Sequence, residues 1–326
     1  MVTLSDIQAA RQRIRHYVRH TPIITTANTL TSAPEKLHLK LENLQVAGSF
    51  KSRGAFNTLL QLDDAARARG VVAASGGNHG VALAYASKQL GISATIFLPE
   101  SVLEDRVNRI GVWGAQVIQA GSAWDDAHTA GLAYAAEHGM TYVHPFDADA
   151  TIAGQGTVGL ELLEDVPDMD IVLIAIGGGG LMAGMGLAIK SLKPNVRVIG
   201  IEPVGAASMK AAVSTGHVVT LPQVRTIADT LSPRAVSDLT LSLTRQCADE
   251  LVLVEDIAMI DAMRWLWRES NQLVEPAGAA VIAALQTGAV DIAGFKHPVA
   301  LICGGNASAG CVFSEYEAAA RSAPAR

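Results

Sequence analysis

Short apolar runs rich in β-branched residues recur along the chain, and a longer segment with helical spacing follows most of them. Near-continuous apolar strands separated by helices are typical of a parallel sheet covered on both faces. The predicted strands are residues 70–74, 94–98, 115–118, 141–143, 171–176, 196–201, 250–254 and 298–302. We therefore predict an α/β fold with two open, twisted, largely parallel sheets, a smaller one from the middle strands and a larger one from the later strands.

Helical patterns between these strands set the expected domain organisation. They cover residues 80–90, 125–138 and 181–192. A glycine directly follows each of the first two, as is common at the end of a helix. No internal repeat or linker marks a boundary, and the predicted division places residues 1–65 and 146–326 in a large domain and residues 66–145 in a small one.

Composition narrows the class of protein. The net charge is −6 at pH 7 and no run of Lys or Arg occurs, so nucleic acid is not an expected partner. No uninterrupted stretch of about 18 apolar residues is present, which argues against a membrane span. The N-terminus lacks the basic and then apolar pattern of a secretory signal, and three cysteines are too few for a disulfide framework. We expect a soluble, cytoplasmic protein.

Sheets of this kind bind ligands beyond the carboxyl ends of their strands, and four of the loops expected there are unusual. The first follows an alternating run at residues 37–42 and carries Lys51 in the opening turn of a predicted helix. Most lysines are solvated surface charges. An amine in this position, with small residues around it, is also suited to forming a covalent bond with a carbonyl compound.

The second loop, residues 75–80, has the sequence Ser-Gly-Gly-Asn-His-Gly. Its glycines leave backbone N–H groups open to a cleft, and Ser75 and Asn78 add side-chain partners, so the loop could hold a carboxylate. A glycine-rich turn with a left-handed Asn78 explains the same residues equally well. We interpret His79 as a residue satisfied at a helix start rather than as an acid or base.

The third loop consists of four consecutive glycines, residues 177–180, between a buried strand and a helix. Because glycine costs chain entropy, such a run indicates close backbone approach to a phosphate at the helix N-terminus. The spacing Gly178-x-Gly180-x-x-Ala183, with Glu202 at the end of the next strand, also fits a dinucleotide fingerprint. NAD is therefore a competing ligand, although this fingerprint leaves the loops of Lys51 and Asn78 unexplained.

The fourth loop begins with Cys303-Gly304-Gly305-Asn306 after an apolar strand. A thiol at a strand end is usually a small buried hydrophobic group. It is also able to offer a weak, neutral hydrogen bond to a ring nitrogen.

Together these loops resemble the fold-type II pyridoxal-phosphate enzymes, in particular the threonine/serine dehydratase and serine racemase branch, whose fold is like that of the tryptophan synthase β subunit. The matching stretches follow the family's order and occupy residues 49–55, 75–79, 152–157, 177–180, 226–229 and 303–306. The resemblance implies an ammonia-lyase that converts L-threonine, L-serine or a related 3-hydroxy amino acid to a 2-oxo acid and ammonia. It also implies a homodimer.

The resemblance further implies roles for individual residues. Lys51 would bind pyridoxal 5'-phosphate covalently as an imine and then remove the α-proton, and Phe50 would pack on the cofactor ring. Asn78 would bond the ring hydroxyl, and Cys303 would face the ring nitrogen as a neutral partner, which favours elimination. The phosphate would be held by Gly177, Gly178, Gly179, Gly180 and Leu181, and the substrate by Ser75, Gly76, Gly77, Asn78 and His79.

Departures from the family refine the expected activity. Racemases of this branch have a serine where Gly76 stands, so we expect poor racemisation. Synthases usually have an aspartate where Ser52 stands, which weighs against β-replacement. An NAD-dependent oxidoreductase, or a catalytically silent binding protein with this fold, remains the hypothesis from another class.

The segment 202–208 resembles the family's cation loop, with Glu202, the Ala206 carbonyl and Ser208 as ligands. A serine at 208 removes the negative charge that the racemases have there. Oxygen ligands with fewer charges suit K⁺ better than Mg²⁺ or Ca²⁺. A strand end followed by an ordinary turn explains the segment equally well.

The substrate side chain is the least determined feature. No arginine occurs between residues 121 and 138, where some relatives contact a second carboxylate, and Trp124 and His128 lie there instead. An acidic substrate such as 3-hydroxyaspartate is therefore not favoured. Thr230, where threonine dehydratases usually have glycine, and the nearby Arg234 are compatible with a bulkier 3-hydroxy amino acid.

Overall fold

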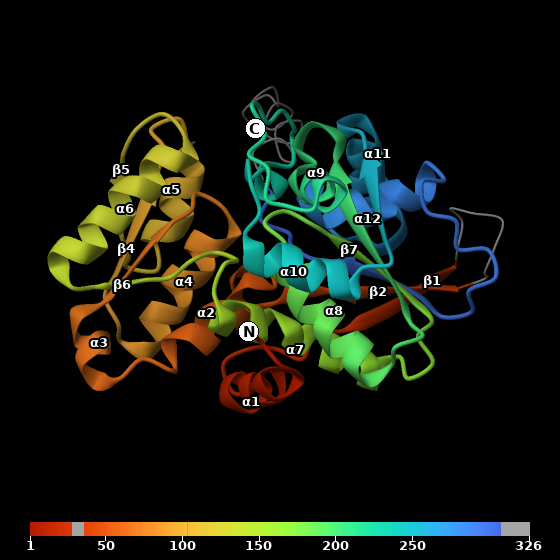
Figure 1. Ribbon diagram of the computed structural model, residues 1–326, viewed down its shortest axis with the longest axis horizontal. Coiled ribbons are helices and arrows are strands. Elements are labelled where there is room, and N and C mark those ends of the chain that lie inside the picture. The colour runs from red at the N-terminus through yellow and green to blue at the C-terminus, as the bar shows by residue number, and fades with distance from the viewer. Residues whose placement is uncertain (28–35, 103, 308–326) are drawn as a thin grey trace, which may run out of the picture.

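The computed structural model describes residues 1–27, 36–102 and 104–307 and confirms the α/β fold (Figure 1). Its strands are β1 (Ile23–Ala27), β2 (Lys36–Leu41), β3 (Val71–Ala74), β4 (Ala94–Leu98), β5 (Gln116–Gln119), β6 (Thr141–Tyr142), β7 (Ile171–Ala175), β8 (Arg197–Pro203), β9 (Glu250–Val254) and β10 (Pro298–Ile302). Its α-helices are α1 (Leu4–Ile14), α2 (Lys51–Leu59), α3 (Asp64–Arg69), α4 (Asn78–Leu90), α5 (Glu104–Gly111), α6 (Trp124–His138), α7 (Asp149–Asp165), α8 (Gly180–Leu192), α9 (Ser208–Thr215), α10 (Asp238–Cys247), α11 (Asp256–Ser270) and α12 (Pro276–Gln286). Short 3₁₀ turns include η1 (Glu42–Leu44), η3 (Val204–Ala206) and η4 (Asp229–Leu231).

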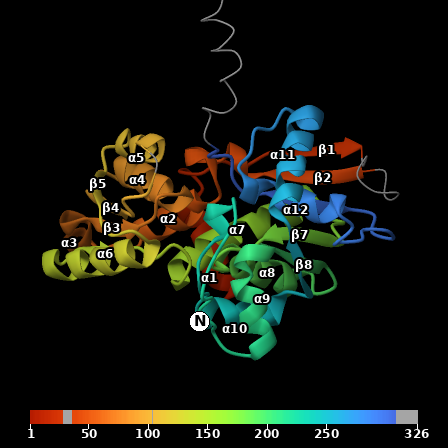
Figure 2. The same cartoon turned by 90° about the horizontal axis from the view of Figure 1, so that it is seen from above.

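The larger sheet has the strand order β1-β2-β10-β7-β8-β9, and all neighbours are parallel except β1 and β2. Strands β7 and β10 are buried along their whole length, as their continuous apolar sequences predict. Helix α12 packs on one face with α11 outside it, and α7 and α8 cover the other face with α1 and α10 outside them (Figure 2).

The smaller sheet has the order β5-β4-β3-β6 and is parallel throughout its described strands. Side chains from successive residues of β3 point to opposite faces. Val71 and Ala73 join the core beneath α4, whereas Val72 and Ala74 pack under α6. The strands of this sheet all fall within the predicted small domain, residues 66–145, but the domain division itself stays a prediction.

The predicted strands and helices agree closely with the structure. Strands β4, β9 and β10 have the predicted bounds, and helices α4 and α6 are capped at their C-termini by Gly91 and Gly139 as expected. Strand β1 was not predicted. Lys51 is the first residue of α2, which packs against α4 on one side and α7 on the other and so lies between the two sheets.

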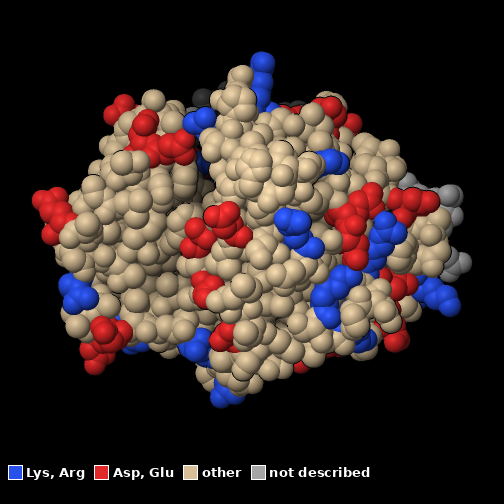
Figure 3. Space-filling view, viewed as in Figure 1, with Lys and Arg blue, Asp and Glu red and all other residues tan. Residues whose placement is uncertain are grey.

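The surface carries both signs of charge in mixture. On the face shown in Figure 3, Lys and Arg side chains lie among Asp and Glu rather than in one patch. Within the described part of the chain, no helix is both long enough and apolar enough to span a membrane.

Candidate active site

Three of the four predicted loops leave neighbouring strands of the larger sheet. In the order β2-β10-β7, the chain after β2 leads to Lys51, the chain after β10 begins at Cys303, and the chain after β7 contains residues 177–180. These strands are parallel, so their carboxyl ends meet at one edge. From β7 the chain continues to β8 on one side, whereas β10 lies on the other side. Such a switch point is where open α/β sheets bind ligands.

The fourth loop, residues 75–80, follows β3 of the smaller sheet and reaches the same cavity. This cavity has a volume of about 400 Å³. The predicted cofactor and substrate residues all line it: Phe50, Lys51, Ser75, Gly76, Gly77, Asn78, His79, Gly177, Gly178, Gly179, Gly180, Leu181 and Cys303. The structure thus brings together segments that are far apart in the sequence, while the role of each residue stays a prediction.

Lys51 places a buried amine in this cavity. Its Nζ donates a hydrogen bond of 2.7 Å to the Pro145 carbonyl and lies 5.2 Å from the centroid of the Phe50 ring. Burial lowers the pKa of Lys51 to about 8, although Cys303 and Glu275 partly oppose this shift. Near pH 7.4 about a fifth of such amines are neutral, against about one in a thousand at the ordinary pKa of 10.5, and the neutral form is the one that attacks a carbonyl carbon.

The glycines 177–180 connect β7 to α8, and the helix begins at Gly180 with Gly179 as its N-cap. A glycine cap has no side chain to accept a bond from the first helical N–H groups, so these donors remain available for an anion. Packing also requires glycine here. A Cβ on Gly178 would lie 2.2 Å from the Phe146 ring, and Gly179 has a φ of +88°. The run of glycines therefore has a structural cause as well as the predicted ligand-binding one.

Asn78 begins α4, which is likewise capped by a glycine, Gly77. Its side-chain amide donates to the Glu275 carboxylate, and its oxygen accepts a 2.7 Å bond from the Asn306 amide. The Asn78 amide has two N–H groups, so one remains for the predicted bond to a ring hydroxyl.

Glu275 is a cavity residue that the sequence analysis missed. It is 5% exposed, and burial raises its pKa to about 7. Its only sequence signal is a carboxylate placed directly before Pro276 and an apolar helix, α12. A charge at such a position needs a partner inside the fold, and Asn78 supplies it.

Cys303 and His79 are both held in their neutral forms. Burial raises the pKa of the Cys303 thiol, which donates to the Ala277 carbonyl at 3.5 Å. Burial lowers the pKa of His79 to about 3, and its Nε2 lies 2.9 Å from the Val143 carbonyl. A carbonyl only accepts, so Nε2 carries the proton of the neutral ring. The buried Nδ1 has no hydrogen-bond partner among the described residues, so the ring is satisfied on one side only, and the role of His79 stays a prediction.

Two ion pairs of opposite polarity join the two sides of the cavity rim. Arg106 of α5 pairs with Asp229 of η4, and Asp125 of α6 pairs with Arg234 at 3.2 Å. All four residues line the cavity. Arginines thus reach the rim from segments outside residues 121–138, but each one is matched by an aspartate.

Trp124 and Thr230 also line the cavity. The Trp124 indole donates to the Ala74 carbonyl at 2.9 Å and stacks on His128, which does not itself line the cavity. The methyl group of Thr230 would lie 3.1 Å from a Cβ on Gly77. Thr230 therefore packs against the predicted carboxylate-binding loop.

The predicted cation ligands lie outside the cavity, at the end of β8 and the start of α9. The Glu202 carboxylate accepts 2.8 Å bonds from the backbone N–H groups of Met209 and Lys210, and burial raises its pKa to about 7. The Ser208 hydroxyl is buried without a hydrogen-bond partner among the described residues. A cation at Glu202, Ala206 and Ser208 stays a prediction.

The cavity fits pyridoxal phosphate, the cofactor that the resemblance implies. The buried amine of Lys51 suits its aldehyde, and the glycine-capped N-terminus of α8 suits its phosphate. The Phe50 ring offers an apolar surface, and the neutral Cys303 thiol would suit a ring nitrogen as its partner. If the glycines at the start of α8 instead held the phosphates of a nicotinamide cofactor, the buried amine of Lys51 would have no role.

Comparison with known proteins gives the same family. The family model described as pyridoxal-phosphate dependent enzyme matches residues 14–304. An L-threonine ammonia-lyase of Thermotoga maritima is 38% identical over 94% of this chain and 76% of its own length. A phenylserine dehydratase of Ralstonia pickettii is 39% identical over 94% of both chains. The structure of maize serine racemase aligns with a TM-score of 0.93 and 33% identity over 98% of both chains. The chain therefore belongs to the pyridoxal-phosphate-dependent enzyme family.

Proposed function

We propose that the protein is an ammonia-lyase that eliminates the β-hydroxyl of L-threonine, L-serine or a related 3-hydroxy amino acid. The observation that carries this proposal is the buried amine of Lys51, with a pKa of about 8, in a cavity lined by two glycine-capped helix N-termini. The names of the ammonia-lyase and dehydratase relatives support the reaction type.

The residues of the cavity divide the work of this reaction. Pyridoxal phosphate, when bound, withdraws electrons from the α-carbon of the attached amino acid and so makes its proton removable. The Lys51 amine accepts that proton, for which a pKa near the working pH is favourable. Ser75 and the first N–H groups of α4 hold the substrate carboxylate. The C–O bond at the β-carbon breaks with loss of water, and hydrolysis of the C–N bond then consumes one water and yields ammonia and the 2-oxo acid.

Racemisation is the second candidate because serine racemases are among the similar proteins. It needs a second acid on the opposite face of the α-carbon. At Gly76 the nearest neighbours of an added Cβ are the methyl groups of Val102 and Leu98, which have no proton to donate. We therefore expect D-serine formation from L-serine to be far slower than ammonia release, as chiral chromatography will show.

A visible spectrum and a substrate panel test the proposed function. The purified protein should show a yellow absorption band that borohydride abolishes, and Lys51→Ala should lose both the band and turnover. L-threonine, L-serine, 3-phenylserine and 3-hydroxyaspartate are then compared for ammonia release. An NAD-dependent oxidoreductase would show no such band, and full activity of Lys51→Ala would refute the assigned base.

We further propose K⁺ at Glu202, Ala206 and Ser208. The unpartnered hydroxyl of Ser208 and the buried carboxylate of Glu202 support the site. Replacing K⁺ by tetramethylammonium, which is too large for such a site, should lower the melting temperature. The Ser208→Ala variant should lose this dependence, and an equal melting temperature in both salts would contradict the proposal.

A cytoplasmic homodimer with the large and small domains given above is the expected form of the enzyme. The family resemblance supports the dimer. Light scattering on the eluting protein tests it, since a single mass near the 34.0 kDa of one chain would contradict it.

A further inference from the structure

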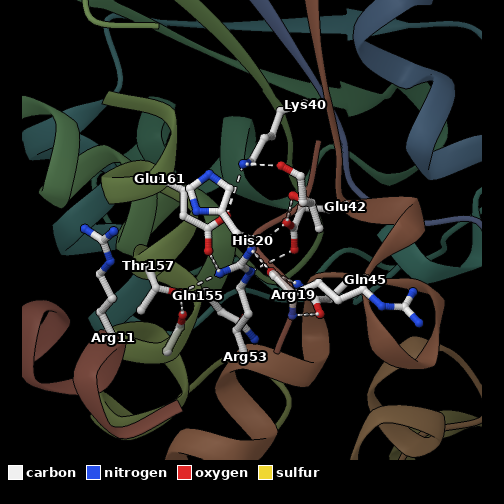
Figure 4. A network of polar contacts seen from close by, with 12 residues as sticks. Arg11, Arg19, His20, Lys40, Glu42, Gln45, Arg53, Gln155, Thr157 and Glu161 are labelled. Atoms are coloured by element: carbon white, nitrogen blue, oxygen red, sulfur yellow. Dashed lines mark hydrogen bonds and ion pairs between the residues drawn. The ribbon is translucent and has the colours of Figure 1, made fainter. Parts of the chain in front are cut away.

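A buried cluster of charges lies behind Lys51 and outside the cavity. We define the Arg53 cluster as Lys40, Glu42, Arg53, Glu161 and Asp165. Figure 4 shows the first four of these residues. None of these residues lines the cavity, so the proposed reaction gives them no direct role. Arg53 and Lys40 are both fully buried, which makes the cluster an unusual feature of the core.

Arg53 uses every nitrogen of its guanidinium in this cluster. Nε and Nη2 donate to the two oxygens of Glu42 at 2.9 and 2.7 Å, and Nη1 and Nη2 donate to the two oxygens of Glu161 at 2.6 and 2.9 Å. Nη1 also reaches the Thr157 hydroxyl at 3.1 Å. The planar guanidinium therefore makes two bidentate pairs, here called forks, one with Glu42 and one with Glu161. Together they define its position and its plane.

Lys40 adds a second buried cation, so the cluster contains two cations and three carboxylates. Its Nζ lies 3.0 Å from Glu161 and 2.8 Å from Asp165. Burial raises the pKa of Glu161, but Arg53 and Lys40 lower it by more, so this carboxylate stays ionised. Arg53 and Lys40 therefore hold Glu161 in its charged form as an acceptor for both of them.

These contacts tie three elements together around Lys51. Glu42 follows β2 in η1, Glu161 lies on α7, and Arg53 lies on α2 two residues after Lys51. Residues two apart on a helix are separated by roughly 200° around its axis. Arg53 therefore anchors the back of α2 to β2 and α7 while Lys51 projects from the opposite side into the cavity.

A buried cluster of charges contributes less to stability than its many contacts suggest. Apolar side chains of similar volume often stabilise as well as a buried ion pair or better, because the charges must be desolvated. The two bidentate pairs instead fix the orientation of α2, because a small rotation of this helix would break several short hydrogen bonds at once.

We propose that Arg53 is a positioning residue for Lys51: its two forks fix the rotation of α2 and thereby the place of the Lys51 amine in the cavity. This inference rests on the proposed role of Lys51. It predicts that disturbing the forks changes the reactivity of that amine and not only the stability of the fold.

The test compares Arg53→Lys, which keeps the charge and loses both forks, with Arg11→Met. Arg11 makes a two-pronged but partly exposed pair with Glu164 on the same helix α7, so it is a matched control. At a temperature well below unfolding, we expect kcat and pyridoxal-phosphate affinity to fall by about tenfold or more in Arg53→Lys, with KM changed much less, because displacements of about 1 Å cost up to about 100-fold. Arg11→Met should change neither quantity.

A measurement that does not depend on turnover separates the positioning role of Arg53 from the proposed ammonia-lyase function. Reductive methylation of the full chain after removal of the cofactor, which frees the Lys51 amine, followed by mass spectrometry of the peptide containing Lys51, gives the pH dependence of that amine's reactivity. A shifted profile in Arg53→Lys supports the positioning role even if the wild type proves inactive on every hydroxy amino acid.

Two further outcomes decide the matter. If Arg53→Lys does not fold, Thr157→Val removes one acceptor and leaves both carboxylate forks, and it should show a smaller change in the same direction. Wild-type kcat, cofactor affinity and Lys51 methylation profile in the folded variant would overturn the proposal, because the cluster would then serve stability alone.

Discussion

The buried amine of Lys51 suits the proposed reaction but lowers the stability of the folded chain. Its amine has a folded pKa of about 8 against an ordinary 10.5, because burial penalises the charged form. The penalty is fully present below pH 8, shrinks as pH rises, and vanishes above 10.5, where the amine is neutral in the folded and the unfolded chain.

Lys51→Met should therefore stabilise the cofactor-free protein. The pKa shift corresponds to about 3 kcal/mol, and losing the bond to the Pro145 carbonyl returns about 1 kcal/mol of it. We expect a net gain of about 2 kcal/mol at pH 7 in urea unfolding, which fades toward pH 10.5. The exposed Lys88→Met is the control and should show no such gain. A gain that is independent of pH would contradict the explanation.

Glu275 gives a second prediction, in which the dependence of stability on pH is reversed. Its folded pKa is raised to about 7 by burial, so its cost is absent below pH 4.5, grows as pH rises, and is complete above about 7. Glu275→Gln keeps an acceptor for Asn78 and should be more stable than the wild type by about 3 kcal/mol at pH 8, but not at pH 4.5. Urea midpoints at the two pH values measure this. Equal differences at both, or the same behaviour in the exposed Glu104→Gln, would rule out burial as the cause.

The sequence singled out Lys51 and the glycines that line the cavity, but not Glu275 or Arg106, and it contained Asp229 only as the last residue of the matching stretch 226–229. Lys51 and the glycines stand out because their type is unusual for the local pattern around them. Glu275 matters only because Asn78, 197 positions away, contacts it. No local pattern records such a contact.

The same distinction holds for whole elements. Buried parallel strands such as β7 and β10 have continuous apolar sequences and were predicted correctly. Strand β1 is an antiparallel edge strand with half-buried Ile23 and Ile24 and an exposed Thr25, so its sequence lacks that run. Its partner β2, not its own composition, makes it a strand.

The loop between β7 and α8 has two explanations, packing against Phe146 and approach of a phosphate, and a pair of variants separates them. Gly178→Ala should reduce cofactor affinity, because its methyl group would meet the Phe146 ring. In the Gly178→Ala/Phe146→Ala double variant that clash is gone, so restored affinity in equilibrium titrations indicates packing alone. Affinity that stays low after correction for Phe146→Ala indicates that the phosphate itself needs the space. Gly111→Ala, where an added Cβ meets nothing, is the neutral control.

At the scale of the whole molecule, the existence of two sheets followed from the order of strands along the chain. Their contact did not, because it depends on residues from separate segments that meet only in the folded chain. The ion pairs Arg106–Asp229 and Asp125–Arg234 join positions 123 and 109 residues apart. Their side chains are between 31% and 53% exposed, so they add little to stability. Their main effect is on substrate binding, because they determine which charges at the rim are free to contact a substrate.

Because Arg106 and Arg234 are each paired with an aspartate, neither of these two described rim arginines is free to bind the second carboxylate of a substrate. Asp229→Asn leaves Arg106 unpaired at the cavity, and kcat/KM for 3-hydroxyaspartate relative to L-threonine should rise by about tenfold, the effect of roughly 1.4 kcal/mol of new attraction. Asp105→Asn removes the same charge from a neighbouring pair, with Arg109, that lies outside the main cavity, and it should leave the ratio unchanged. An equal rise in both variants would mean that net charge attracts the substrate, whereas a rise in Asp229→Asn alone means that Arg106 binds its second carboxylate directly.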